Sequence, residues 1–305
     1  MIVVSVPPEA EGLRLDRFLA SLPQVGTRSA AERLVETGSV RVDGVAREKS
    51  FRLSPGQRVE LPEPEREEPL QPEAMPLRVL YEDPYLLVID KPAGLAVHPG
   101  AGRKRGTLAQ GALALGAAGG PPERAGIVHR LDRDTSGLIV VARDEEAHRR
   151  LQALVRRRLV EREYVALVRG RPLSWRGRIE APIGRDRRYP RRQSLDTDSP
   201  RPAVTYFEVV ELLEPYALLR VRLETGRTHQ IRVHLAAIDL PVVGDPVYGV
   251  SGLGVRRQFL HAARLAFPHP MSDERVEVES PLPAELEEAL ARARGTQAEN
   301  SRARS

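Results

Sequence analysis

The sequence predicts an α+β protein with a small N-terminal module and a large domain built on a mixed, largely antiparallel sheet with flanking helices. Two observations support this. Residues 62–75 are acidic and rich in proline, with almost no residues that build a core, so they predict an extended linker. Beyond them, short apolar segments that are typical of buried strands alternate with a helical pattern. A chain of 305 residues is long enough for two unequal domains.

The N-terminal module, residues 1–61, shows two helix patterns followed by strand patterns. Residues 15–22 carry apolar side chains at helical spacing. A second helix begins near Ser29, which opens a capping box, and ends at Gly38, a typical residue after a helix. Residues 40–45 predict a strand that turns at an Asp-Gly pair, and residues 58–61 predict a closing strand.

The large domain, residues 76–283, is expected to hold the sheet. Its predicted strands are residues 86–90, 138–142, 164–168, 204–210 and 218–223, and its predicted helix is residues 144–158. After Leu282 we expect a short helix through Leu290 and then a disordered polar tail, so that residues 284–305 lie outside the domain.

Composition narrows the class of protein and its compartment. There is no cysteine, which excludes disulfides, iron–sulfur clusters and thiolate zinc sites and fits a reducing compartment. The N-terminus lacks the pattern of a signal peptide, and no apolar run approaches the roughly 20 residues that span a bilayer. We therefore expect a soluble, cytoplasmic protein with no membrane partner.

The positive charge is unevenly distributed. The formal net charge is +5, yet the N-terminal module holds nine basic and eight acidic residues, and the linker is acidic. The excess therefore lies in the large domain, as expected of a protein with a polyanionic partner such as a nucleic acid.

Residues 129–137, H-R-L-D-R-D-T-S-G, are the most informative segment. They place Asp132 between Arg130 and Arg133 and run directly into the apolar strand at 138–142. Neighbouring positive charge favours an ionised carboxylate, which can act as a nucleophile or a base on a loop held by a rigid strand. In isolation, an Arg-Leu-Asp tripeptide is more often a surface turn. The complete run, however, resembles the active-site motif of the RluA/RluD family of pseudouridine synthases, which implies that Asp132 is catalytic.

Further segments carry the same resemblance in the family's order. Residues 90–100 resemble the motif K-P-x-G-L-x-V-H-P, and their continuation through 108 is similar to the D-type enzymes of the large ribosomal subunit. Residues 161–170 place Tyr164 at the family's active-site tyrosine, which implies that it packs against the target base and assists proton removal. Residues 223–234 contain T-G-R-T-H-Q-I-R-V-H, and a G-D-x-x-Y-G motif follows at 244–249. The resemblance implies an ion pair between Arg232 and Asp132.

The resemblance also implies contacts with RNA. The N-terminal module is similar to the alpha-L (S-four-type) RNA-binding domain. Near the catalytic motif, Arg130 would fill the gap left by a flipped base. The implied RNA-binding residues are Arg28, Arg33, Arg41 and Lys49 in the module and His129, Arg130, Arg227 and His229 in the large domain.

No cofactor or metal is expected. The chain lacks G-x-x-x-x-G-K-[ST] and G-x-G-x-x-G, which bind nucleoside triphosphates and dinucleotides. His229 and His234 fall on different helical faces, and no acidic third ligand accompanies them, which argues against a metal site. Pseudouridine formation is an isomerisation, so it requires neither.

The function implied by the resemblance is isomerisation of specific uridines in 23S rRNA, by base flipping and an Asp132 nucleophile. Attack on the anomeric carbon, elimination to a glycal and addition to carbon 6 of the ring all remain open. The expected partner is large-subunit rRNA or a ribosomal particle, bound by a monomer. Two alternatives stand beside this function: the same chemistry at another rRNA site, and a non-catalytic RNA chaperone or ribosome assembly factor.

Overall fold

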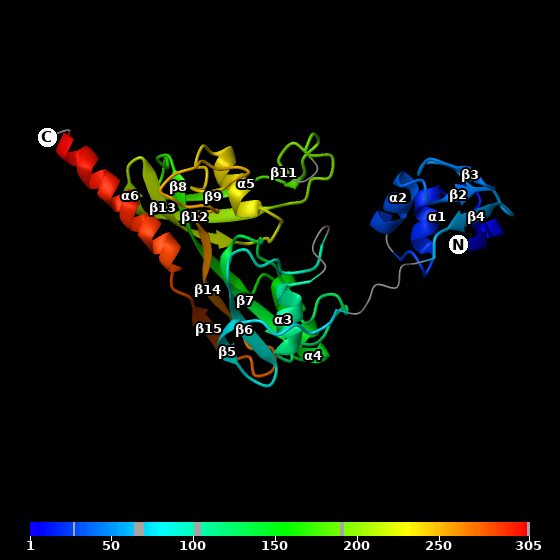
Figure 1. Cartoon of the computed structure of the whole chain (residues 1–305), viewed down its shortest axis with the longest axis horizontal. Helices are drawn as coiled ribbons and strands as arrows, with labels where there is room; N and C mark the ends of the chain where they lie inside the picture. The colour runs from blue at the N-terminus through cyan, green and yellow to red at the C-terminus, as the bar shows by residue number, and fades with distance from the viewer. Residues whose placement is uncertain (27, 64–69, 101–104, 190–191, 304–305) are drawn as a thin grey trace. The chain divides into compact units, whose positions relative to one another are not determined.

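A computed structural model describes residues 1–26, 28–63, 70–100, 105–189 and 192–303 of the chain (Figure 1). The chain divides into two compact units, Met1–Glu68 and Pro69–Ser305. The boundary falls within the linker predicted at 62–75, of which residues 64–69 lie outside the described residues.

The N-terminal unit packs two helices against a small antiparallel sheet. Its helical elements are the 3-10 helix η1 (Pro8–Ala10), α1 (Leu15–Ser21) and α2 (Arg28–Glu36). Its strands, in the sheet order β1-β4-β2-β3, are β1 (Ile2–Ser5), β4 (Arg58–Leu61), β2 (Arg41–Val42) and β3 (Val45–Ala46). The turn between β2 and β3 places Asp43 and Gly44 at positive φ, as the Asp-Gly pair predicts. The predicted helices and strands of this unit are confirmed. The predicted capping box stays a prediction, because the side chain of Ser29 lies outside the part of the chain that the structure describes.

A buried carboxylate ties the two helices of this unit together. The Asp16 side chain on α1 is fully buried and accepts two hydrogen bonds from Arg14, at 3.0 and 3.1 Å. It also accepts one from Arg28 at the start of α2, at 3.1 Å. The hydrogen bond from Arg14 is the main cause that holds the pKa of Asp16 below its usual range, against the opposing effect of burial.

We expect Asp16→Asn to destabilise the N-terminal unit at neutral pH and to remove an acid-sensitive part of its stability. Because the pKa is depressed in the folded state, this contribution is present above the unfolded pKa of about 3.9 and is lost as pH falls through the lower, folded pKa. Amide hydrogen exchange of residues 1–61 in the full chain, at neutral and acidic pH, measures it. Glu9→Gln is the matched control at an exposed position, and equal protection in both variants would contradict the prediction.

The large unit is built on one mixed sheet, which confirms the predicted fold class. Within the described residues, nine strands form this sheet in the order β5-β6-β7-β14-β8-β13-β12-β9, with β15 paired to β14. The pair β7–β14 is parallel and its other strand pairs are antiparallel. The strands are β5 (Arg78–Glu82), β6 (Leu86–Lys91), β7 (Ser136–Ala142), β8 (Glu161–Arg169), β9 (Arg176–Glu180), β12 (Val204–Leu213), β13 (Tyr216–Leu223), β14 (Leu260–Pro268) and β15 (Arg275–Glu279). A separate hairpin joins β10 (Gly184–Arg185) and β11 (Gln193–Ser194).

Helices cover both faces of the β6–β7 part of the sheet. On one face, α4 (Glu145–Arg156) packs Ala147 and Leu151 into an apolar cluster with β6 and β7. Its N-cap is Asp144, whose Oδ1 accepts a hydrogen bond from the backbone N–H of Ala147 at 2.7 Å. On the other face, α3 (Leu108–Ala114) packs its buried residues into the main core, which α5 (Gln230–Ala237) joins from a place beside β11 and β12 (Figure 1). The strand β7 is therefore buried along its whole length.

The C-terminal helix is longer than the sequence predicted. The expected short helix through Leu290 is part of α6 (Ala284–Ala303), so the polar tail expected to be disordered from Gly295 onward is helical through Ala303. Its apolar residues Leu286, Ala289 and Leu290 join the main core. Alanine and arginine make up seven of the thirteen residues 291–303, and their high helix propensity lets the helix continue past Gly295. Among the described residues, no helix is both long and apolar enough to cross a membrane.

Candidate active site

The loop that carries Asp132 is fixed by the glycine at its end. Gly137 has a φ of +109° and pairs with Ala262 on β14. A Cβ atom at this position would lie 2.2 Å from the carbonyl oxygen of Ala262, so only glycine permits this approach. The T-S-G end of the motif therefore brings the loop directly against the middle of the sheet.

Two hydroxyl groups of the same motif hold the loop to the segment that enters β14. The Thr135 hydroxyl accepts a hydrogen bond from Gln258 at 3.2 Å. The Ser136 hydroxyl lies 2.9 Å from Nδ1 of His261 and accepts a hydrogen bond from Arg257 at 3.1 Å. Both hydroxyl side chains are buried, so these contacts fix the backbone that positions Asp132.

Lys91, at the end of β6, supports the loop from the other side. Its side chain is fully buried, and its Nζ donates hydrogen bonds to the carbonyl oxygens of Pro92, Leu95 and Arg133, at 2.9 to 3.0 Å. Burial lowers the pKa of Lys91 to about 7, against the opposing effect of Asp134. The turn that follows Lys91 is thus attached to the residue directly after Asp132.

Asp132 forms the predicted ion pair with Arg232. The NH1 group of Arg232, on α5, donates to Oδ2 of Asp132 at 2.9 Å, which confirms the pairing. The remaining face of the same guanidinium is held by Asp245, which accepts from Nε at 2.6 Å and from NH2 at 2.8 Å. The Asp245 side chain is fully buried, and its Oδ1 also accepts from the backbone N–H groups of Val247 and Tyr248. Two carboxylates therefore fix one arginine, which raises its pKa further.

The tyrosine of the G-D-x-x-Y-G motif connects this arginine to His229. The Arg232 guanidinium lies 5.1 Å from the centre of the Tyr248 ring, within the range of a cation–π contact. The Tyr248 hydroxyl lies 2.9 Å from Nδ1 of His229 and accepts a hydrogen bond from the backbone N–H of Gln193. His229 has a φ of +57°, an uncommon backbone conformation for a histidine. Burial is the main cause that lowers the pKa of His229.

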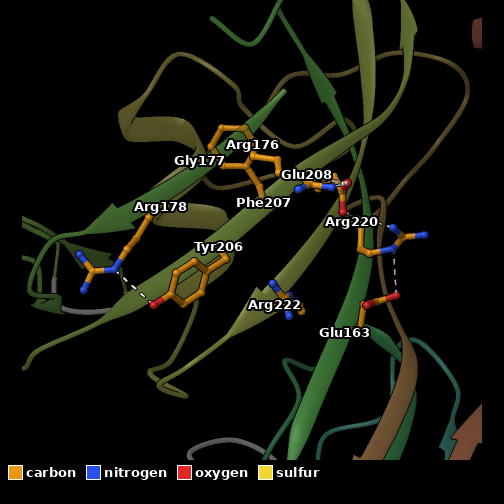
Figure 2. Close-up of a pocket in the computed structure, with 9 residues that line it drawn as sticks. All are labelled: Glu163, Arg176, Gly177, Arg178, Tyr206, Phe207, Glu208, Arg220 and Arg222. Atoms are coloured by element: carbon orange, nitrogen blue, oxygen red, sulfur yellow. Dashed lines mark hydrogen bonds and ion pairs between the residues drawn. The ribbon is translucent and has the colours of Figure 1, made fainter. Parts of the chain in front are cut away.

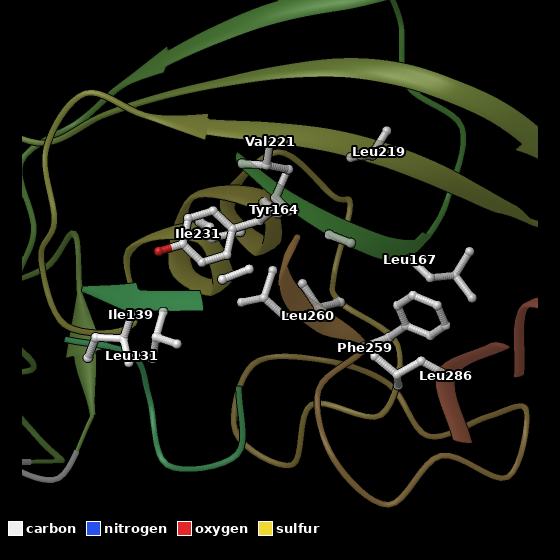
Figure 3. Close-up of a cluster of buried hydrophobic side chains, with 14 of the residues drawn as sticks. Leu131, Ile139, Tyr164, Leu167, Leu219, Val221, Ile231, Phe259, Leu260 and Leu286 are labelled. Carbon is white, nitrogen blue, oxygen red and sulfur yellow. The ribbon is translucent and has the colours of Figure 1, made fainter. Parts of the chain in front are cut away.

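Tyr164 lies on β8 beside this group of charges. Its ring belongs to the main core, where it packs with Val221, Ile231 and Leu260 (Figure 3). Tyr164, Asp132 and Arg232 line one pocket. Burial raises the pKa of the Tyr164 phenol above its usual range, so the hydroxyl is protonated at neutral pH. The pocket therefore offers a carboxylate, a neutral phenol and a flat apolar surface.

The predicted RNA-binding residues of the large unit fall into two groups. Arg130 and Arg227 are exposed and line the mouth of the pocket, and His229 also lines it. His129 instead faces inward: its Nε2 accepts a hydrogen bond from the backbone N–H of Val140 at 3.1 Å. Burial lowers the pKa of His129 to about 3, so its ring is neutral. His129 thus holds the motif against β7, and its contact with RNA stays a prediction.

The predicted RNA-binding residues of the N-terminal unit are exposed, and three of them have partners within the unit. Arg28 pairs with Asp16, Lys49 lies 3.7 Å from Glu36, and Arg41 donates to the carbonyl of Gly44. For Arg33, the described part of the chain offers no hydrogen-bond or ion-pair partner.

Comparisons with known proteins agree with this geometry. The model of the RNA pseudouridylate synthase family matches residues 85–237, and that of the S4 domain matches residues 13–59. The chain is 40% identical to an uncharacterized RNA pseudouridine synthase, YlyB, of Bacillus subtilis, over 95% of this chain and 97% of that protein. The chain belongs to the RNA pseudouridine synthase family. This assignment confirms the predicted family, the predicted enzymatic class and the small S4 domain at the N-terminus.

Other relatives extend the comparison. The chain is 42% identical to ribosomal large subunit pseudouridine synthase D of Pseudomonas aeruginosa, over 92% of each protein. The solved structure of human RNA pseudouridylate synthase domain containing 1 is similar with a TM-score of 0.56 and 30% identity, over 68% of this chain and 84% of that one.

Sequence reasoning assigned no role to Asp245, Tyr248, Lys91 or Arg162, although each lies in a segment that carries the family resemblance. A signal existed for Lys91, because a lysine at the end of an apolar strand must satisfy its charge inside the protein. Asp245 offered no such signal, since its partner is known only once α5 and the following loop are placed.

We expect Asp245→Asn to destabilise the enzyme by about 3 kcal/mol, because it leaves the buried Arg232 with a single charged partner. Urea unfolding of the full chain at neutral pH measures this loss. Glu211→Gln removes a carboxylate from an exposed bidentate pair with Arg294 and should cost less than about 1 kcal/mol. Equal losses in the two variants would show that Asp245 does not carry the buried pair.

Proposed function

We propose that this pseudouridine synthase isomerises specific uridines of 23S rRNA, and that Asp132 is its catalytic nucleophile. The observation that carries the proposal is the arrangement of Asp132 in a pocket shared with Tyr164, where Asp132 is paired with Arg232 and Arg232 is in turn fixed by Asp245. Relatives named ribosomal large subunit pseudouridine synthase D, 42% identical over more than nine-tenths of this chain, support rRNA as the substrate.

The geometry suits a reaction that breaks and remakes a bond to the same base. The bond between nitrogen 1 of uracil and the ribose breaks, the base turns, and carbon 5 bonds to the ribose. The hydrogen of carbon 5 then leaves as a proton, and nitrogen 1 takes up a proton, so the overall change is an isomerisation. The carboxylate of Asp132 reaches the pocket through its partly exposed side chain, while Arg232 occupies one of its oxygens. The second oxygen is left for the nucleotide, at the anomeric carbon or at carbon 6 of the ring.

Tyr164 and Arg130 complete this proposal. The Tyr164 ring offers a packing surface for the base, and its neutral hydroxyl is a hydrogen-bond donor and acceptor. Arg130 is exposed at the pocket mouth, in a position to fill the stack after the uridine has left it. Arg227 and His229 line the same mouth and contact the flanking nucleotides, while the S4 domain binds RNA through Arg28, Arg33, Arg41 and Lys49. The enzyme acts as a monomer.

We expect Asp132→Asn to abolish release of tritium from carbon 5 of uridine, with a loss of at least about a thousand-fold. The assay uses a large-subunit rRNA transcript and, separately, subunits assembled on labelled, unmodified rRNA. Asp273→Asn makes the same chemical change in the turn between β14 and β15, where the residue is exposed and at positive φ, and should leave the rate unchanged.

Each result has one meaning. Release by Asp132→Asn at the wild-type rate would refute the role of Asp132. Release by the wild type from neither substrate would refute the proposed substrate and favour an assembly factor that binds RNA. Mapping the modified nucleotides then decides between 23S sites.

A further inference from the structure

Arg162 is a buried cation for which the described residues offer no partner, and it lines the same pocket as the proposed nucleophile. It lies on β8, two residues before Tyr164, so both side chains leave the same face of the strand. Only 8% of the residue is exposed, and it lines the pocket that contains Asp132. Its Nε has no hydrogen-bond partner, and no carboxylate of the described residues pairs with its guanidinium.

The other deeply buried arginine of the pocket shows how unusual this is. Arg232 is held by two carboxylates through all three of its guanidinium nitrogens. A buried charge without compensation is costly, so folded proteins keep one mainly where it serves a ligand. Asp132 is already paired with Arg232, so Arg162 is not needed to balance that carboxylate.

The loop opposite Arg162 leaves room for its head group. A Cβ atom at Gly226 would lie 2.7 Å from NH1 of Arg162. Glycine at this position therefore lets the guanidinium lie against the loop that joins β13 to α5, which is the wall of the pocket. Within the T-G-R segment, Gly226 thus leaves room for Arg162, and the next residue, Arg227, lies at the pocket mouth.

We propose that Arg162 binds an anionic oxygen of the target nucleotide inside the pocket. The inference rests on the proposed function, because the nucleotide enters the site of Asp132. Two oxygens have the required chemistry: a phosphate oxygen of the nucleotide, and a uracil carbonyl oxygen that gains negative charge when the bond to the ribose breaks. A guanidinium suits both, since its donors lie in one plane and always carry charge.

The opposite face of the same sheet supplies the control. Figure 2 shows a hollow there, in which Arg176 is paired with Glu208 and Arg220 with Glu163. Arg222 lies in this hollow opposite Glu163 of β8, is exposed, and has no ion-pair partner among the described residues. Arg222→Met removes the same charge as Arg162→Met, from the face that points away from the pocket.

The first experiment compares activity and thermal stability. Arg162→Met should lower kcat for tritium release by about 100-fold or more without lowering Tm, because it removes an uncompensated buried charge. Arg162→Lys should recover part of the rate, and Arg222→Met should change neither quantity. Full activity of Arg162→Met overturns the proposal, as does a parallel loss of activity and Tm, which would show a structural role.

The second experiment separates the two oxygens and does not depend on turnover. The Tm of the wild type, Arg162→Met and Arg222→Met is measured with uridine and with uridine 5′-monophosphate. A phosphate contact predicts a larger shift with the monophosphate, which Arg162→Met alone loses. A uracil contact predicts equal shifts with both compounds and a kcat defect at unchanged KM. If the wild type is inactive on RNA, the proposed function fails, but the binding role of Arg162 is still tested. Loss of the monophosphate-induced Tm shift in Arg162→Met then supports binding of the phosphate by Arg162. An unchanged shift then contradicts the proposed role of Arg162.

Discussion

The sharing of Arg232 between two carboxylates is the constraint around which the catalytic unit is arranged. Asp132 comes from the loop before β7, Arg232 from α5, and Asp245 from the loop after it. Burying this guanidinium without carboxylate partners would be costly, so the packing of these segments is most favourable when all three charges meet. The ion pair thus joins the β7 and α5 parts of the core and, in the same contact, orients the carboxylate toward the pocket.

The support behind Asp132 follows from the same need for rigidity. Gly137 allows a close approach to Ala262, while Lys91 holds the carbonyl of the residue after Asp132. The polar residues of the motif are therefore mostly structural, although they surround the proposed nucleophile. This explains why a run of nine residues is so specific: most of its positions meet a separate packing or hydrogen-bonding requirement.

The sequence predicted those parts of the structure that depend on local chemistry. The helix expected from residue 144 forms as α4, and the Asp-Gly turn joins β2 and β3. The Asp132–Arg232 pair was implied by the family resemblance of two motifs. The strand β14 was not predicted, because its alanines and its histidine break the apolar alternation, and its central place is set by pairing with strands far earlier in the chain. Asp245 was missed for a similar reason, since its role exists only in three dimensions.

Arg162 and Arg232 illustrate how burial separates structure from function within one pocket. Both guanidinium groups lose contact with water on folding. Among the described residues, only Arg232 gains carboxylate partners in place of that water. A buried cation that is paired with carboxylates helps to hold the folded structure together. A buried cation without such a partner lowers the stability of the protein, and its hydrogen-bond donors remain free to bind a ligand. In this pocket, Arg232 therefore stabilises the fold, and the electrostatic partner that we propose for Arg162 is the substrate.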